Sequence, residues 1–321
     1  MEKTRNQMID LIRFILSIGI IMIHAQLFKT TSPLAYSLIT MGLTRIAVPF
    51  FFVVSGYYFY QRVINHGNIK AYFMRLIKIF IIFEGIEIVT YTLPMLSMIQ
   101  EYGLLAYFWK IISVGLGGAY WYIISLLLSL ALLLPFWKKK KITPMLMIGL
   151  LFYLVVMTND SYGGLFTNTS LQSIAKIHTT LWTWPQAGLC SSLLYLSIGA
   201  WLYQKQPHIQ HINIFLFFSI IALLLEAYFL QTHQAYDGNC YFSLLICVPL
   251  LFLWSFQYQE LPFDTLSIGK MSLYIYMLHP IVLNCVHFLL PLGEMGSFFI
   301  TVIISLCLSY MIVKRSLGEC Q

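Results

Sequence analysis

Two ionisable side chains lie in the first long apolar stretch of the sequence, LIRFILSIGIIMIH at residues 11–24. Arg13 and His24 are eleven residues apart, which in an α-helix is within about 20° of three full turns. Both side chains would share one helix face, roughly 16 Å apart along the axis, and Asp10 would share it as a partner for Arg13. Ionisable groups in hydrocarbon are costly unless they face a cavity or the protein interior. The stripe therefore indicates a polar cavity, with a snorkelling arginine and a structurally hydrogen-bonded histidine as the alternative.

Histidine chemistry is expected at two places. A neutral imidazole can take a proton from a hydroxyl group near neutral pH, so His24 is a candidate general base. His279 precedes Pro280 in GKMSLYIYMLHP, residues 269–280, and is a second catalytic candidate. A proline inside a helix frees a backbone carbonyl that His279 could satisfy, so a structural role stays open.

Acidic side chains that could orient His24 are few. Glu84 and Glu87 follow one another on the third predicted helix, and Glu84 is taken as the catalytic candidate. Pairing of these acids with arginines is the structural alternative. Asp10 is disfavoured, because fourteen residues place it about 21 Å from His24 along the helix.

A third constellation, FMRLIKIF at residues 73–80, places two cations one helical turn apart. Arg75 and Lys78 could hold a phosphate-bearing ligand from the cytosol. The alternative is that they only mark the cytoplasmic end of a membrane-crossing helix. With Arg13 they form the predicted cofactor-binding set.

Substrate-binding candidates come from RIAVPFFFVVSGYYF at residues 45–59 and from AYWYIISL at 119–126. Arg45 would lie near the outer end of its helix, where it needs a partner. Pro49 is expected to break the helical ladder, and Ser55-Gly56 to let another backbone approach. Tyr122 is expected near the outer surface. Helix packing and an interfacial aromatic belt are the structural alternatives.

The elements that position these residues follow from composition. The chain of 321 residues is 59% hydrophobic and only 10% charged, against about 25% charged residues in soluble domains. No polar stretch is long enough for a soluble domain, so we predict one membrane domain over residues 1–321. The predicted fold is an all-α, polytopic membrane bundle. Its ten candidate spans cover residues 8–28, 41–60, 77–98, 119–136, 142–157, 186–203, 212–230, 239–257, 269–290 and 297–314. Segment 103–116 could be interfacial or re-entrant, and loop 158–185 carries two candidate belt residues, Trp182 and Trp184.

The basic residues predict the orientation. With the N-terminus in the cytoplasm, fourteen of the 19 lysines and arginines face inside, three face outside and two lie within spans. Both termini are then cytoplasmic. This distribution explains the net charge of +7 without a nucleic-acid partner. The six cysteines show no CxxC spacing, so we expect buried thiols and no metal site.

The ordered set of motifs resembles acyltransferase family 3, whose members are multi-span membrane proteins that O-acylate envelope glycans and other acceptors. Arg13 and His24 match its pattern of a basic residue, ten residues and a histidine. RIAVPFFFVVSGYYF is similar to its FF-x-x-SG helix, and SLYIYMLHP resembles its late helix ending in histidine. Arg75 and Lys78 fall where the family has R-x-x-R, with lysine replacing the second arginine.

The resemblance implies an activity and its ligands. The donor would be a cytosolic acyl-CoA, commonly acetyl-CoA, with its phosphates near Arg13, Arg75 and Lys78. His24 would be the base, and the acceptor a glycan or lipid-linked saccharide. Direct transfer and a transient acyl-enzyme both stay open. The expected location is the inner (plasma) membrane, with lipid as a partner, and the sequence leaves the oligomeric state open.

A second interpretation comes from a subgroup of the same resemblance. A similar membrane domain is fused to amino-acid racemases in some glycopeptide-resistance proteins, where it is taken to supply serine. RIAVPFFFVVSGYYF and YDGNCYFSLLICVPLLFLW at residues 236–254 look like that subgroup. The alternative function is therefore transport or binding of a small polar solute such as serine.

Overall fold

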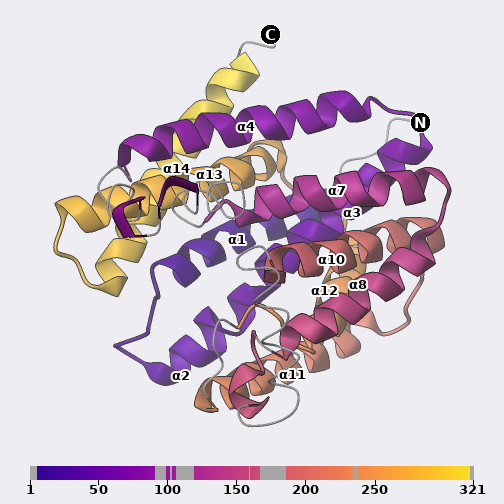
Figure 1. Ribbon diagram of the computed structural model, residues 1–321, viewed down its shortest axis with the longest axis horizontal. Helices are drawn as coiled ribbons and strands as arrows, with labels where there is room; N and C mark the ends of the chain where they lie inside the picture. The colour runs from indigo at the N-terminus through magenta and orange to yellow at the C-terminus, as the bar shows by residue number, and fades with distance from the viewer. Residues whose placement is uncertain are drawn as a thin grey trace. The chain divides into compact units, whose positions relative to one another are not determined.

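The computed structural model describes residues 6–90, 99–101, 103–105, 119–158, 160–166, 186–233 and 238–318 (Figure 1). Within these ranges the regular structure is helical and contains no strand, which confirms the all-α prediction. The predicted interfacial character of segment 103–116 falls mostly on residues outside these ranges. Trp182 and Trp184 lie outside them too.

Each of the ten predicted apolar segments corresponds to a helix. These helices are α1 (Gln7–His24), α3 (Ala47–Ile64), α4 (Ile69–Thr90), α7 (Trp121–Lys138), α8 (Ile142–Met157), α10 (Gln186–Lys205), α11 (Ile212–Thr232), α12 (Leu244–Gln257), α13 (Leu266–Leu289) and α14 (Glu294–Gly318). Short turns add α2 (Pro33–Ala35), the π-helix η1 (Tyr36–Thr40) and the 3-10 helices η2 (Leu43–Ile46) and η3 (Gly163–Phe166).

Length and composition identify six membrane-spanning candidates among the described helices. They are Gln7–His24, Pro33–Ile64, Trp121–Lys138, Ile212–Thr232, Leu266–Leu289 and Glu294–Ser316. The helices α8 and α12 are apolar but shorter. The count of ten spans and the cytoplasmic placement of both termini stay predictions.

Two helices differ in extent from the spans predicted on them. The helix α4 begins at Ile69, before the span predicted from residue 77, because the Asn68 side chain accepts a hydrogen bond from the Ala71 amide at 2.8 Å and caps the helix there. Within the span predicted from residue 41, the α-helix α3 begins at Ala47, after η2. Pro49 therefore lies in the first turn of α3, where its missing N–H costs nothing, and does not break the ladder.

The chain forms two compact units. The first comprises Met1–Ala47, Ile209–Tyr228 and Ile246–Gln321, and the second Val48–His208 and Phe229–Leu245. The prediction of a single membrane domain is untested by this division and stays a prediction.

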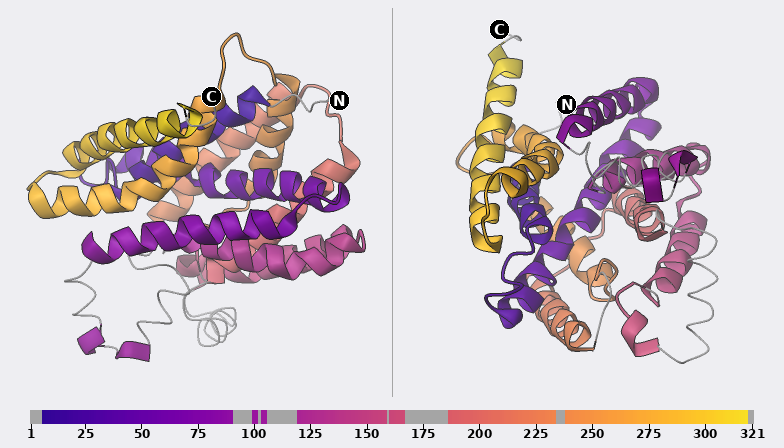
Figure 2. Two further views of the ribbon diagram at one scale, coloured as in Figure 1. Left: turned by 90° about the horizontal axis from the view of Figure 1, so that it is seen from above. Right: turned by 60° about the vertical axis from the view of Figure 1, so that its left-hand side comes forward.

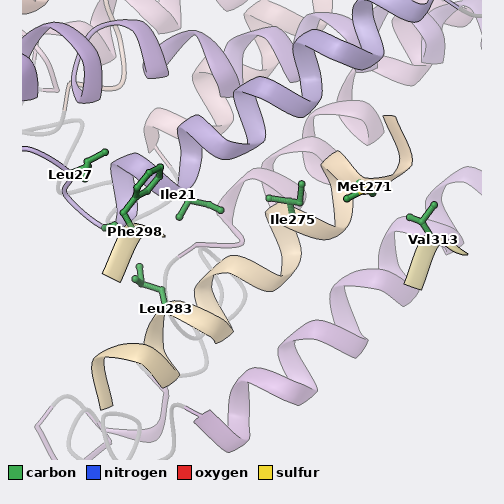
Figure 3. Packing of buried hydrophobic residues seen from close by; sticks show 8 residues of the cluster. Ile21, Leu27, Met271, Ile275, Leu283, Phe298 and Val313 are labelled. Atoms are coloured by element: carbon green, nitrogen blue, oxygen red, sulfur yellow. The ribbon is translucent and has the colours of Figure 1, made fainter. Parts of the chain in front are cut away.

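In the first unit, α13 packs against both α1 and α14. Both views of Figure 2 show α13 and α14 side by side. Apolar side chains from the three helices meet in one cluster, seen in Figure 3. Its members are Ile21, Ala25, Leu27, Met271, Ile275, Leu283, Phe298 and Val313.

A stripe of hydroxyl residues on α14 accompanies this packing. Every fourth residue is small and polar, and each side chain is fully buried: Ser297, Thr301, Ser305 and Ser309. Small side chains let helix backbones approach closely in membranes. The four-residue spacing is readable in the sequence, although our prediction did not use it.

In the second unit, α10 packs against α7 and α8, and α4 packs against α7. Glycines set the closest approaches. A Cβ at Gly149 on α8 would lie 2.9 Å from the Leu194 Cα on α10, and one at Gly56 on α3 would lie 2.2 Å from the Leu196 carbonyl oxygen. The predicted backbone approach at Ser55-Gly56 is thus present, and its partner is α10.

Candidate active site

The first unit brings the two predicted catalytic histidines together. His24 is the last residue of α1 and His279 lies within α13. Their ring centroids are 4.9 Å apart, with the ring planes tilted by 48°. The two positions are far apart in sequence, and the packing of α1 against α13 places them in contact.

A proline fixes the orientation of His279. Pro280 has no N–H, so it cannot donate to the carbonyl of Tyr276 four residues earlier. His279 Nδ1 lies 2.6 Å from that carbonyl oxygen and takes the place of the missing donor. The side chain is fully buried. Among the described residues, its Nε2 atom has no hydrogen-bond partner.

Three further predicted residues belong to the first unit. Arg45 lies in η2, half-buried, with its Nη2 atom 3.1 Å from the Met41 sulfur. Arg13 is half-buried on α1. Asp10 is buried and accepts a hydrogen bond from the Thr265 hydroxyl at 3.3 Å. The sequence did not predict that Asp10 would bond to Thr265, the N-cap residue of α13.

The remaining predicted residues belong to the second unit. Ser55 on α3 and Tyr122 on α7 approach each other, with their hydroxyl oxygens 3.4 Å apart. Phe51 and Phe52 pack against the Tyr122 ring. Tyr122 is thus buried at 7% exposure and does not sit in an exposed aromatic belt.

The helix α4 carries the predicted cations and acids on different faces. Arg75 and Lys78 are exposed, so both are available to an anionic ligand. Glu84 and Glu87 are buried, at 7% and 0% exposure. Burial of both carboxylates marks the interior side of this helix.

A buried acid that our prediction missed lies just after α8. Asp160 accepts hydrogen bonds from the backbone amides of Asn239 and Cys240, at 2.7 and 2.9 Å, and from the Ser161 hydroxyl at 2.8 Å. This arrangement joins two loops of the second unit. No local sequence motif predicts it, because the two backbone amide donors are 79 and 80 residues away.

No group of three or more metal-ligating side chains occurs in the part of the chain that the structure describes. The histidine pair can support proton transfer between an imidazole nitrogen and a hydroxyl group.

Fold and site together define a multi-pass helical membrane protein in which a half-buried histidine contacts a fully buried one. A family profile described as an acyltransferase domain matches residues 6–314. The chain therefore belongs to acyltransferase family 3, as the motif resemblance predicted.

Two curated relatives are amino-acid racemases of enterococci. The chain is 27% identical to a serine/alanine racemase of Enterococcus gallinarum over 89% of its own length and 42% of the relative. It is 24% identical to an amino-acid racemase of Enterococcus faecalis over 98% of its own length and 47% of the relative. The chain thus spans less than half of each relative, in agreement with the predicted subgroup. No solved structure matches significantly.

Proposed function

We propose that the protein is a membrane O-acyltransferase. It moves an acyl group, in the first instance acetyl, from cytosolic acyl-CoA to a hydroxyl of a cell-envelope glycan or lipid-linked saccharide in the plasma membrane. The observation that carries the proposal is the contact of His24 with His279 in a chain that belongs to an acyltransferase family. An accessible imidazole at position 24, in contact with the buried ring of His279, suits removal of a hydroxyl proton.

The other predicted residues take roles that suit their chemistry. In the second unit, the exposed cations Arg75 and Lys78 bind CoA phosphates. In the same unit, Ser55 and Tyr122, whose hydroxyl oxygens lie 3.4 Å apart, contact the acceptor. Glu84 supplies a buried carboxylate. No metal takes part in this scheme.

The test is acyl transfer by the purified chain in lipid nanodiscs. Acetyl-CoA and a mixed pool of envelope glycans are supplied, and release of free CoA thiol is followed. His24→Ala should lower the rate at least 100-fold, since positioned general bases contribute about 10²- to 10⁴-fold. The matched control is His287→Ala, which removes an exposed histidine from α13 and should leave the rate unchanged. Equal rates for parent and His24→Ala would refute the role of the base.

A second candidate function is transport of a small polar amino acid such as serine. The observation in its favour is that both curated relatives are named amino-acid racemases and extend beyond the region matched here. Uptake of labelled L-serine into proteoliposomes, with no thiol release from any acyl-CoA, would favour transport over transfer.

A further inference from the structure

The buried Nε2 atom of His279 requires a hydrogen-bond donor. A backbone carbonyl can only accept, so the 2.6 Å contact with Tyr276 places a proton on Nδ1. In the neutral ring, Nε2 then carries the lone pair. This atom is buried and has no partner among the described residues. Leaving an acceptor unpaired in such a position is destabilising, because it has lost its hydrogen bond to water.

His24 is placed to supply that donor. Its ring lies against His279, with 4.9 Å between the centroids and the ring planes tilted by 48°. A neutral imidazole has one N–H, and the terminal torsion of a histidine side chain is broad. Rotation of the His24 ring therefore directs its N–H at Nε2 of His279.

We propose that His279 is a positioning residue for His24. Its Nε2 atom accepts a hydrogen bond from one ring nitrogen of His24, so the other nitrogen of His24 presents its lone pair to the acceptor hydroxyl. The chain of bonds begins at the Tyr276 carbonyl, which Pro280 leaves without its helical donor. This inference rests on the proposed acyl transfer and specifies how the ring of the base is oriented.

The acyl transfer needs only the acceptor, the acyl-CoA and His24. The hydroxyl oxygen of the acceptor forms a bond to the thioester carbonyl carbon while its proton passes to the free nitrogen of His24. The carbon–sulfur bond breaks. The departing CoA thiolate takes up that proton from His24, which leaves an ester, CoA thiol and neutral His24.

Two isosteric variants separate positioning from packing. His279→Asn keeps a donor for the Tyr276 carbonyl but loses the acceptor at the Nε2 position, whereas His279→Gln can place its amide oxygen near that position. We expect kcat to fall about 100-fold in the Asn variant, with KM for acetyl-CoA unchanged, and to recover about tenfold in the Gln variant. His287→Ala serves as the control on the same helix. Equal loss in both His279 variants, or a loss confined to KM, would overturn the proposal.

A spectroscopic test is independent of turnover. Nitrogen-15 NMR of histidine-labelled protein in nanodiscs should show His279 protonated at Nδ1, with a coupling through the N–H···N bond to His24. The coupling should vanish in His24→Ala and persist in His287→Ala. A His279 ring protonated at Nε2 would refute the inference even if the enzyme is active. If the coupling is present but no acyl-CoA turns over, the proposed function fails and the histidine pair stands.

Discussion

The crossing of α3 and α10 gives a sharp stability prediction for Gly56→Ala. A Cβ at this position would lie 2.2 Å from the Leu196 carbonyl oxygen and 2.7 Å from the Leu196 Cα, where ordinary contact begins at 3.4 Å. Both atoms are backbone, so no side chain can rotate away. The two helices must separate by roughly 1 Å, which weakens the dispersion contacts along the crossing.

Two opposing terms set the expected magnitude. Overpacking a tight contact costs about 1–3 kcal/mol. Replacing glycine by alanine inside a helix returns at most about 1 kcal/mol. The overpacking term exceeds the propensity term, so we expect a net loss of about 1–2 kcal/mol and a lower Tm.

The assay is thermal unfolding in detergent, followed by tryptophan fluorescence and by retention of the monodisperse species. Gly85→Ala on α4 is the matched control, because nothing lies within 4 Å of a Cβ built there. It should be neutral or slightly stabilising. Gly199→Ala tests the opposite side of the crossing, since its Cβ would lie 2.2 Å from the Val53 carbonyl oxygen. The reasoning is refuted if Gly56→Ala is as stable as Gly85→Ala.

Four further predictions follow from the site. Arg75→Ala and Lys78→Ala should each raise KM for acetyl-CoA about tenfold, the scale of a lost hydrogen bond to a charged group, while Lys70→Ala on the same helix should leave it unchanged in the thiol-release assay. Tyr122→Phe should alter unfolding by less than about 1 kcal/mol, because its contact with Ser55 is a long 3.4 Å, and should raise KM for the acceptor. Asp160→Asn should cost about 1–3 kcal/mol in thermal unfolding, because the two backbone amides lose a charged acceptor and the new NH2 group faces the Asn239 side-chain amide, itself a donor; exposed Asp264→Asn is its control. Pro280→Ala supplies a helical N–H to the Tyr276 carbonyl in competition with His279, so it should raise Tm while lowering kcat. A parent-like kcat with a raised Tm would contradict the inference that the Tyr276 carbonyl holds the His279 proton on Nδ1.

Features that depend on residues close together in the sequence were predicted better than contacts between residues that are far apart in it. Apolar length alone located ten helices, and the effect of Pro280 on the Tyr276 carbonyl needed only helix geometry. The contact of His24 with His279 was beyond such reasoning, because it depends on which helix packs beside α1. Asp160 was missed for the same reason, since its amide donors come from a distant loop. The start of α4 at Ile69 was not predicted, because hydropathy reports apolar length and not a single capping residue such as Asn68.

The distribution of buried and exposed side chains on α4 indicates whether water or lipid surrounds its exposed face. Its carboxylates Glu84 and Glu87 are buried, while the neighbouring Ile81 and Ile82 are 61% and 58% exposed. Water would favour the reverse arrangement, because it stabilises charge and disfavours exposed hydrocarbon. Lipid favours the observed one. The charged residues of α4 keep it outside the six helices that composition selects, yet its carboxylates face inward and its cations lie in the N-terminal half, where long side chains can reach the interface. We therefore expect the C-terminal half of α4 to lie within the membrane, with Arg75 and Lys78 near the boundary where an anionic donor would arrive.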